Sequence, residues 1–268
     1  MRFRPTGSTL RAALVYTLAA CVFTWPLVFH LRTLFGALDP TGDPSLNLWT
    51  LGWDLRTLSE HPAWLLTGRV FDANIFFPAP HTLAYSDHLL LQALALWPLY
   101  AVTHDLVLCY NVLLIASLTA SALAMHLLAR TLLGFAGSGG SERTAYVAGL
   151  IFGFAPYHFT HLTHIQLQAL YFLPLAFLFL HRVLATGRRA DAVGLGVVVG
   201  LQAVSSAYYG IIGAVGLAVA AVALALLGGR WRDWRLLGRG VLAAGVAVLI
   251  VLPWSIPYLQ VEREASAG

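Results

Sequence analysis

Long apolar runs are the feature that most restricts the fold of this chain. They occupy residues 12–31, 106–133, 144–160, 166–184, 190–209, 210–227 and 240–260. A helix needs about 20 apolar residues to cross a hydrocarbon core of about 30 Å. Apolar residues make up 59% of the sequence and charged residues only 10%, a balance typical of polytopic membrane proteins. We therefore predict an all-α transmembrane helix bundle of about seven spans, organised as a single domain over residues 1–268.

The segment 88–103 is ambiguous. At 1.5 Å per residue it reaches only about 24 Å, and Pro98 interrupts it. If it does not cross, the Arg-bearing loops share one side of the membrane with the Arg-rich N-terminus, as the positive-inside rule favours. We therefore expect a bacterial inner-membrane protein with a cytoplasmic N-terminus. Residues 32–105 then form a long outer loop that carries amphipathic surface helices.

Acidic and histidine side chains concentrate on the outer side of this topology. The stretch 39–88 holds six of the twelve acids, namely Asp39, Asp43, Asp54, Glu60, Asp72 and Asp87. Spanning a membrane does not require such sorting, so we expect any chemistry in this region. The sixteen basic residues are all Arg and lie scattered in loops, which argues against a nucleic-acid surface.

The stretch 45–60 has the pattern of a helix that lies on the membrane surface. Leucines recur along one stripe of this helix at three- and four-residue spacing. Asn47, Thr50 and Asp54 form a polar stripe beside it, and Trp49 and Trp53 form a third. We expect the two tryptophans to lie at the depth of the lipid headgroups.

Asp43 comes just before this helix and has two compatible roles. It is placed to be the N-cap, with Pro44 at the first helical position. Capping alone explains the residue, and this purely structural role stays open. Donors at a helix start also favour the ionised form of a carboxylate, which is the form that a general base needs.

Three histidines, His158, His161 and His164, follow one another at three-residue intervals. Three interpretations stay open: a metal site, hydrogen bonds to a phosphate or sugar, and a polar collar at the membrane interface. Zinc pairs on helices prefer four-residue spacing, which disfavours the first. Cys21 and Cys109 lie in apolar runs without metal-binding spacing.

Several polar residues in the loops have a structural alternative. Ser86 or Asp87 is suited to cap the short apolar helix that follows, and Asp72 is typical of a turn. Tyr208 and Tyr209 lie in the expected outer turn between two spans, where they either anchor the interface or line an outer cavity.

The order of these features resembles the GT-C superfamily of integral-membrane glycosyltransferases, in particular its bacterial branches similar to dolichyl- and polyprenyl-phosphate-mannosyltransferases. A first span precedes a long outer loop with an early Asp, surface helices and, further on, the histidines. The resemblance covers nearly the whole chain as a pattern. The segments that carry it are Gly42-Asp43-Pro44, Asn74-Ile75-Phe76-Phe77-Pro78, Leu83-Ala84-Tyr85-Ser86-Asp87-His88 and Ala148-Gly149-Leu150-Ile151-Phe152-Gly153-Phe154-Ala155-Pro156-Tyr157.

This resemblance implies a polyprenyl-phosphate-linked sugar donor and a lipid or glycan acceptor outside the cytoplasm. It implies that Asp43 is the catalytic base, and it allows a divalent metal, Mg²⁺ or Mn²⁺, at Asp43 with Asp87 or Asp39. The chain lacks the adjacent acidic pair of several branches and has fewer spans than usual, as a truncated member would. The side chains expected to contact the donor are Asp87, His88, His158, His161, His164, Arg56 and Arg32.

Two other classes stay open. An inactive scaffold or assembly subunit has the same layout, and exchanging Asp43 for Asn would leave its activity intact. A transporter of a small solute or lipid needs ionisable groups or broken helices near the bilayer midplane. The best candidates for such groups within the spans are Gln202, Asn111 and His126.

Overall fold

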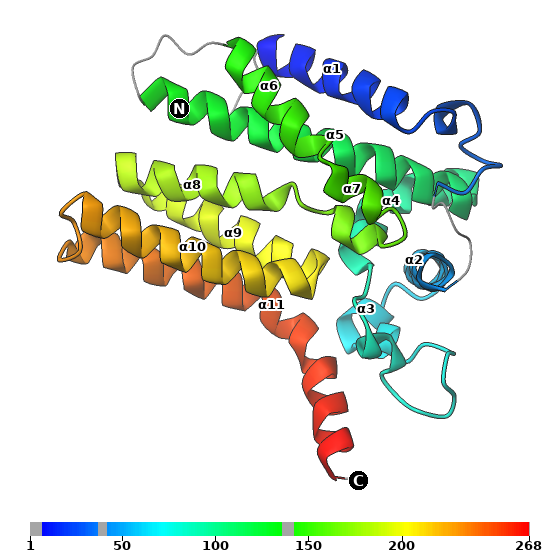
Figure 1. Ribbon diagram of the computed structural model, residues 1–268. Coiled ribbons are helices and arrows are strands. Elements are labelled where there is room, and N and C mark those ends of the chain that lie inside the picture. Colours follow the sequence, from blue (N-terminus) through cyan, green and yellow to red (C-terminus); the bar gives the residue numbers. More distant parts are fainter. Residues whose placement is uncertain (1–6, 37–41, 136–141, 268) are drawn as a thin grey trace.

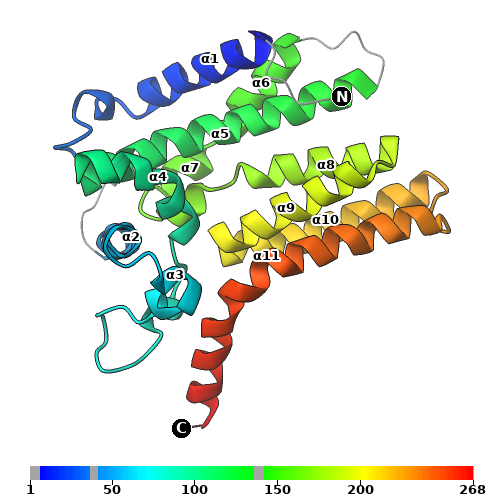
Figure 2. The same cartoon turned by 180° about the vertical axis from the view of Figure 1, so that it is seen from behind.

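The computed structural model describes residues 7–36, 42–135 and 142–267, and this part of the chain is all-helical. Helices make up 80% of the structure, and the described residues contain no strand, which confirms the predicted all-α class. Seven helices lie roughly side by side and form the body of the molecule (Figures 1 and 2). These are α1 (Gly7–Phe23), α5 (Leu106–Phe135), α6 (Glu142–Gly153), α8 (Phe172–Thr186), α9 (Arg189–Ser205), α10 (Ala207–Leu227) and α11 (Trp234–Ala267).

Two helices organise this bundle. Helix α5 packs against α1, α6 and α8, and helix α9 packs against α8, α10 and α11. Small residues permit the closest approaches. A Cβ on Gly153 of α6 would lie 2.4 Å from the Cβ of Ala122 in α5, and one on Gly196 of α9 would lie 2.3 Å from the carbonyl oxygen of Ala243 in α11. Glycine at these positions therefore lets the helix backbones pack in contact, as is common between membrane helices.

Four helical segments are long and apolar enough to cross a membrane: Leu106–Gly134, Ile165–Thr186, Ala207–Leu227 and Trp234–Ser266. This supports the membrane character of the chain. Two further apolar helices, α1 and α4 (Leu90–Thr103), are shorter. The number of seven spans therefore remains a prediction.

Prolines explain where helices end earlier than the apolar runs. The run 12–31 contains helix α1 only as far as Phe23, because Pro26 follows and proline restricts the residue before it. The run 144–160 is divided into α6 and the short α7 (Pro156–Thr160) in the same way. Hydropathy alone does not locate these breaks.

Helix α11 is longer than predicted. It was expected to end near residue 260 with a polar tail, but it continues to Ala267. Pro253 and Pro257 lie inside it, and its last part turns away from the bundle (Figures 1 and 2). The Tyr258 hydroxyl donates a hydrogen bond to the Ser86 carbonyl oxygen at 2.9 Å, which joins this part of α11 to the outer loop.

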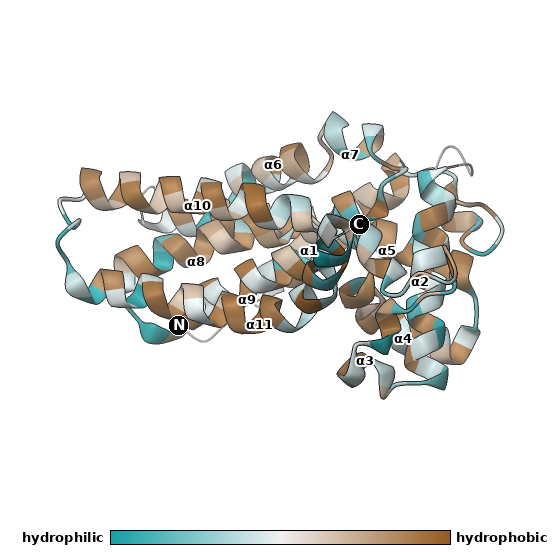
Figure 3. Cartoon of the chain, turned by 90° about the horizontal axis from the view of Figure 1, so that it is seen from below, coloured by the Kyte–Doolittle hydropathy of each residue, from teal (hydrophilic) through white to brown (hydrophobic). Residues whose placement is uncertain are grey.

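One end of the bundle carries a separate group of short helices, which we call the head (residues 42–105). It contains α2 (Asp43–Glu60), α3 (Trp64–Thr67) and α4, with the 3-10 turns η2 (Arg69–Phe71) and η3 (Thr82–Tyr85). Helix α4 packs mainly against α2 and lies with the head at the end of the bundle (Figures 1 and 3). Figure 3 also shows hydrophilic residues at the two ends and hydrophobic ones along α8 to α11 between them.

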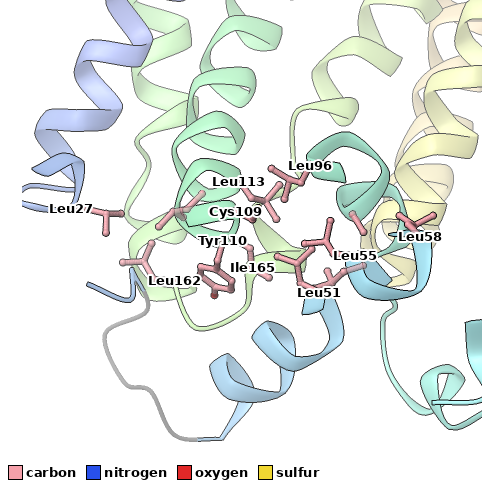
Figure 4. Close-up of a cluster of buried hydrophobic side chains, with 13 residues drawn as sticks. Leu27, Leu51, Leu55, Leu58, Leu96, Cys109, Tyr110, Leu113, Leu162 and Ile165 are labelled. Carbon is pink, nitrogen blue, oxygen red and sulfur yellow. The ribbon is translucent and has the colours of Figure 1, made fainter. Parts of the chain in front are cut away.

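An apolar core fixes the head to the bundle. Leu51 and Leu55 of α2 are fully buried and point into this core (Figure 4). Burying each such leucine contributes about 1.5–3 kcal/mol. The other helices contribute Leu96, Cys109, Tyr110, Leu113, Leu162 and Ile165, among others.

The opposite end of the bundle is rich in arginine. Arg130 of α5 lies 3.6 Å from Glu142 and donates a hydrogen bond to Ser8 of α1 at 2.9 Å. Arg182 and Asp191 pair at 2.8 Å across the turn between α8 and α9. The chain thus places these cationic groups and the acidic head at different ends of the molecule.

Candidate functional site

Asp43 lies in the first turn of α2, at the edge of the head. The N-cap is Gly42, with φ of 67°, so the prediction that Asp43 is the N-cap is displaced by one residue. Glycine accepts this backbone conformation without strain. The Asp43 side chain is 62% exposed, and its Oδ2 lies 2.9 Å from Nε2 of His164.

On the other side of its ring, His164 is held by Thr163. Its Nδ1 lies 2.8 Å from the hydroxyl oxygen of Thr163. When Nε2–H donates to Asp43, Nδ1 of the neutral ring accepts from this hydroxyl. The Thr163 carbonyl also accepts a hydrogen bond from Asn47 of α2 at 3.2 Å, which keeps the histidine segment against the helix that carries Asp43.

Asp43 and His164 open onto a polar cavity of about 370 Å³, which we call the Asp43 cavity. The cavity lies between α2, the segment before α4, the histidine segment and the start of α10. Its other polar lining residues are Asn47, Ser86, Asp87, Tyr157, Gln166, Tyr208 and Tyr209.

Asp87 caps a helix that lies far away in the sequence. Its Oδ1 accepts a hydrogen bond from the Ala207 amide at 3.1 Å, and its Oδ2 accepts one from the Ser206 hydroxyl at 3.4 Å, both at the start of α10. The following helix α4 instead has Leu89 as its N-cap, and its Leu90 amide donates to Nδ1 of His88 at 3.3 Å, so the predicted capping of α4 by Ser86 or Asp87 is wrong. Burial raises the pKa of Asp87, and these two hydrogen bonds oppose that rise.

Two tyrosines form a hydrogen-bonded wall of the cavity. The hydroxyl groups of Tyr157 and Tyr209 bond to each other, and the Tyr157 ring stacks on His161 with centroids 4.1 Å apart. Tyr209 belongs to the first turn of α10, since α9 ends at Ser205, rather than to a loop. Both Tyr208 and Tyr209 line the Asp43 cavity, which is one of the two roles that the sequence left open.

The three histidines separate in the structure. His158 is 1% exposed, and Gln168 bonds both to its Nδ1 and to its carbonyl oxygen, so it fastens α7 to the following turn. His161 is half-buried beside His164, with ring centroids 6.2 Å apart. Of the three, only His164 lines the Asp43 cavity.

His88 faces a second, mostly apolar cavity of about 410 Å³ between α9, α10 and α11, which we call the apolar groove. Its ring is 5% exposed and stacks against Trp254 at 5.6 Å. Burial lowers the pKa of His88 to about 4, so the ring is neutral at pH 7. Asp87 lines both cavities and therefore stands in the wall between them.

Asp54 is a residue whose environment the sequence did not reveal. It is 0% exposed, and neither carboxyl oxygen makes a well-formed hydrogen bond within the described residues. Burial raises the pKa of Asp54 well above its usual range, while the amide of Leu89 lowers it to a smaller degree. Its place on one stripe with Asn47 and Thr50 was visible in the sequence, but the stripe faces the interior rather than water.

The remaining expected contacts lie away from the Asp43 cavity. Arg56 is on another face of α2, where it pairs with Glu60 at 2.9 Å. Arg32 lies 3.8 Å from Asp105. Asp72 accepts a hydrogen bond from the His81 amide at 3.1 Å and so closes a loop, in keeping with its turn pattern. Asp39 lies outside the described residues.

Metal ligands do not gather anywhere in the described ranges: no three His, Cys, Asp or Glu side chains are placed to hold one ion. Asp43, Asp87 and His164 share a cavity, but they are not placed to hold one ion together. No protein-family model, curated protein or solved structure matches this chain. The geometry of the site is therefore the basis for assigning a function.

Proposed function

We propose that this chain is a membrane glycosyltransferase that moves a sugar from a polyprenyl-phosphate-linked donor to an acceptor outside the cytoplasm. One observation carries the proposal: a polar cavity with a solvent-accessible carboxylate adjoins an apolar groove, and the Asp87 carboxylate stands between them. A donor with a sugar, a phosphate and a long apolar chain needs this combination of surfaces. The resemblance to the GT-C superfamily points to the same reaction.

The orientation belongs to the same proposal. The bundle crosses a bacterial inner membrane about seven times, with the head outside and the N-terminus inside. The position of α4 beside α2 at the end of the bundle supports a non-crossing α4. The arginines at the other end support a cytoplasmic location for that end.

Asp43 acts as the general base. The acceptor hydroxyl oxygen attacks the anomeric carbon, its proton passes to the Asp43 carboxylate, and the bond from carbon to phosphate oxygen breaks with its electron pair on the phosphate. A phosphate leaves without protonation, so the reaction needs no second acid. With 62% of its side chain exposed, Asp43 is accessible to an acceptor arriving from water.

Hydroxyl donors of the cavity stabilise the departing phosphate. Tyr157 and Tyr209 face the same cavity as Asp43, and their mutual hydrogen bond uses only one of their two O–H groups. Preorganised donors of this kind stabilise charge that develops in a transition state. Arg56 does not line this cavity, so we omit it from the phosphate site. A divalent ion in this cavity would have the carboxylates of Asp43 and Asp87 as its anionic ligands among the described residues.

A transporter receives less support. Two of the polar side chains buried in the bundle donate hydrogen bonds to the protein backbone. Asn111 bonds to the carbonyl oxygens of Leu31 and Leu34, and Gln202 donates to the Ala169 carbonyl. Partners of this kind indicate a role in packing rather than in a solute path.

Replacing Asp43 by Asn tests the proposal. The full chain in lipid nanodiscs is incubated with a radiolabelled polyprenyl-phosphate sugar and an acceptor, and transfer is measured. Loss of a general base is expected to slow transfer by about 10²–10⁴-fold. Glu264→Gln, which removes an exposed acid at the end of α11, is the matched control and keeps full activity. Wild-type transfer rates in Asp43→Asn would contradict the assignment of Asp43 as the base, whereas absence of transfer by the original chain would favour a scaffold.

A further inference from the structure

A third cavity lies on a different face of α2 from Asp43. It measures about 480 Å³, and we call it the Trp cleft. It shares no lining residue with the Asp43 cavity or the apolar groove, and the proposed reaction does not use it. Its lining residues are Trp49, Gly52, Trp53, Arg56, Thr57, Glu60, His61, Trp64, Asn74 and Leu106.

The aromatic rings of the Trp cleft are held in two stacked pairs. Trp49 and Trp53 have centroids 6.1 Å apart and an interplanar angle of 19°, and His61 and Trp64 stack at 4.4 Å with the same angle. The Trp53 indole N–H donates to the Val70 carbonyl oxygen at 2.8 Å, which fixes that ring. Preorganised flat apolar faces lose little conformational entropy when a ligand binds.

The polar groups of the cleft are balanced in charge. Arg56 donates to Glu60 at 2.9 Å, so the lining cation and anion offset each other. Asn74 adds an amide. An anionic headgroup gains little from a paired guanidinium, whereas the hydroxyl groups of an uncharged polyol are suited to fixed amide, carboxylate and guanidinium groups.

From these observations we infer that the Trp cleft binds a neutral pyranose oligosaccharide. The C–H faces of the sugar rings pack on the indoles, and the hydroxyl groups bond to Arg56, Glu60 and Asn74. Pockets of roughly 300–1,000 Å³ with aromatic walls and few polar groups are typical ligand sites.

The position of the cleft indicates what this glycan does. Leu46 lines the Asp43 cavity and Trp49 lines the Trp cleft, and these residues are neighbours one turn apart on α2. From Trp49 to Asp43 the distance along the helix axis is about 9 Å, which a short oligosaccharide covers. The bound glycan is thus the remote part of the acceptor, an assignment that rests on the proposed function, whereas the binding itself does not.

Saturation-transfer NMR and calorimetry on the full chain in nanodiscs test this inference, with neutral tetrasaccharides of glucose, mannose and galactose as probes. Trp49→Leu removes one stacking face and is expected to weaken binding roughly tenfold. Trp64 is not substituted, because His61 stacks on its ring and the Arg69 guanidinium also lies over it, 5.0 Å from the centroid. Arg56→Gln leaves all rings in place and is expected to weaken binding as well. Trp25→Leu is the matched control, because Trp25 is 67% exposed and lies outside the cleft.

Binding that is lost in the cleft variants but kept in Trp25→Leu and in Asp43→Asn supports the inference. The Asp43→Asn arm separates it from the proposed function, since that variant loses transfer while still binding glycan. Absence of binding by all three probes, or equal binding in every variant, overturns it. A vesicle experiment tests whether lipid occupies the cleft instead. Quenching of Trp49 and Trp64 fluorescence by brominated phosphatidylcholine would place these rings in the bilayer and would also overturn the inference.

Discussion

Replacing Asp54 by Asn is expected to change how the stability of the protein depends on pH. The Asp54 carboxyl is 0% exposed, and burial raises its pKa well above the usual range. In the unfolded chain the same group ionises near pH 4. Between these two pKa values the unfolded state releases a proton that the folded state keeps. Asp54 therefore costs the folded state about 1.4 kcal/mol for each pH unit in that window.

The Asn side chain does not ionise, so this cost disappears in the variant. Burying its amide adds a constant offset of about 1–3 kcal/mol that does not vary with pH. The free energy of unfolding of Asp54→Asn, minus that of the original chain, is thus expected to rise by about 1.4 kcal/mol per pH unit above about pH 4. The rise ends at the pKa of Asp54 in the folded protein, and below about pH 4 the difference is flat.

Reversible unfolding in detergent, followed between about pH 4 and pH 7, measures this slope. Glu60→Gln on the same helix is the control. Glu60 forms an exposed pair with Arg56, worth at most about 1 kcal/mol, so its removal gives no comparable slope. A difference that stays constant with pH, or one that falls as pH rises, would refute the argument that Asp54 is buried in its neutral form.

Two further substitutions probe the connections of the head. Leu55→Ala empties part of the core between α2 and the bundle and is expected to lower the free energy of unfolding by about 2–5 kcal/mol. Leu66→Ala, at a position 90% exposed, is expected to change the free energy of unfolding little. Equal effects of the two substitutions would contradict the packing of Leu55 in this core. Asp87→Ala leaves the Ala207 amide uncapped and is expected to cost about 0.5–2 kcal/mol. Hydrogen exchange at the start of α10 measures that loss, and unchanged protection there would show that the cap contributes nothing.

Local signals in the sequence predicted much of the architecture. The all-α class follows from apolar runs of membrane length, and the leucine periodicity gave α2 to within two residues at its start. Charge sorting separated the arginines from the acidic head. These properties depend on residues that are close together in the chain, so they can be predicted from a single sequence.

Contacts between distant segments could not be predicted in this way. Asp87 accepts its hydrogen bonds at Ser206 and Ala207, about 120 residues away, so the local pattern suggested the wrong helix. The burial of the polar stripe with Asp54 could not be predicted, because nothing in α2 itself reveals that α4 packs against it. The regular spacing of the three histidines suggested one shared role, whereas His158 is buried against Gln168 and His164 meets Asp43.

The last part of α11 contacts the apolar groove and the loop before α4 at the same time. Its residues Val251, Trp254, Ser255, Tyr258, Leu259 and Glu262 line the apolar groove. Among them, Trp254 stacks on His88 and the Tyr258 hydroxyl bonds to the Ser86 carbonyl, at the residues on either side of Asp87. On the proposed function, a hydrocarbon tail that displaces this part of α11 would also displace the loop that bears Asp87, so occupation of the apolar groove and the shape of the Asp43 cavity would be coupled.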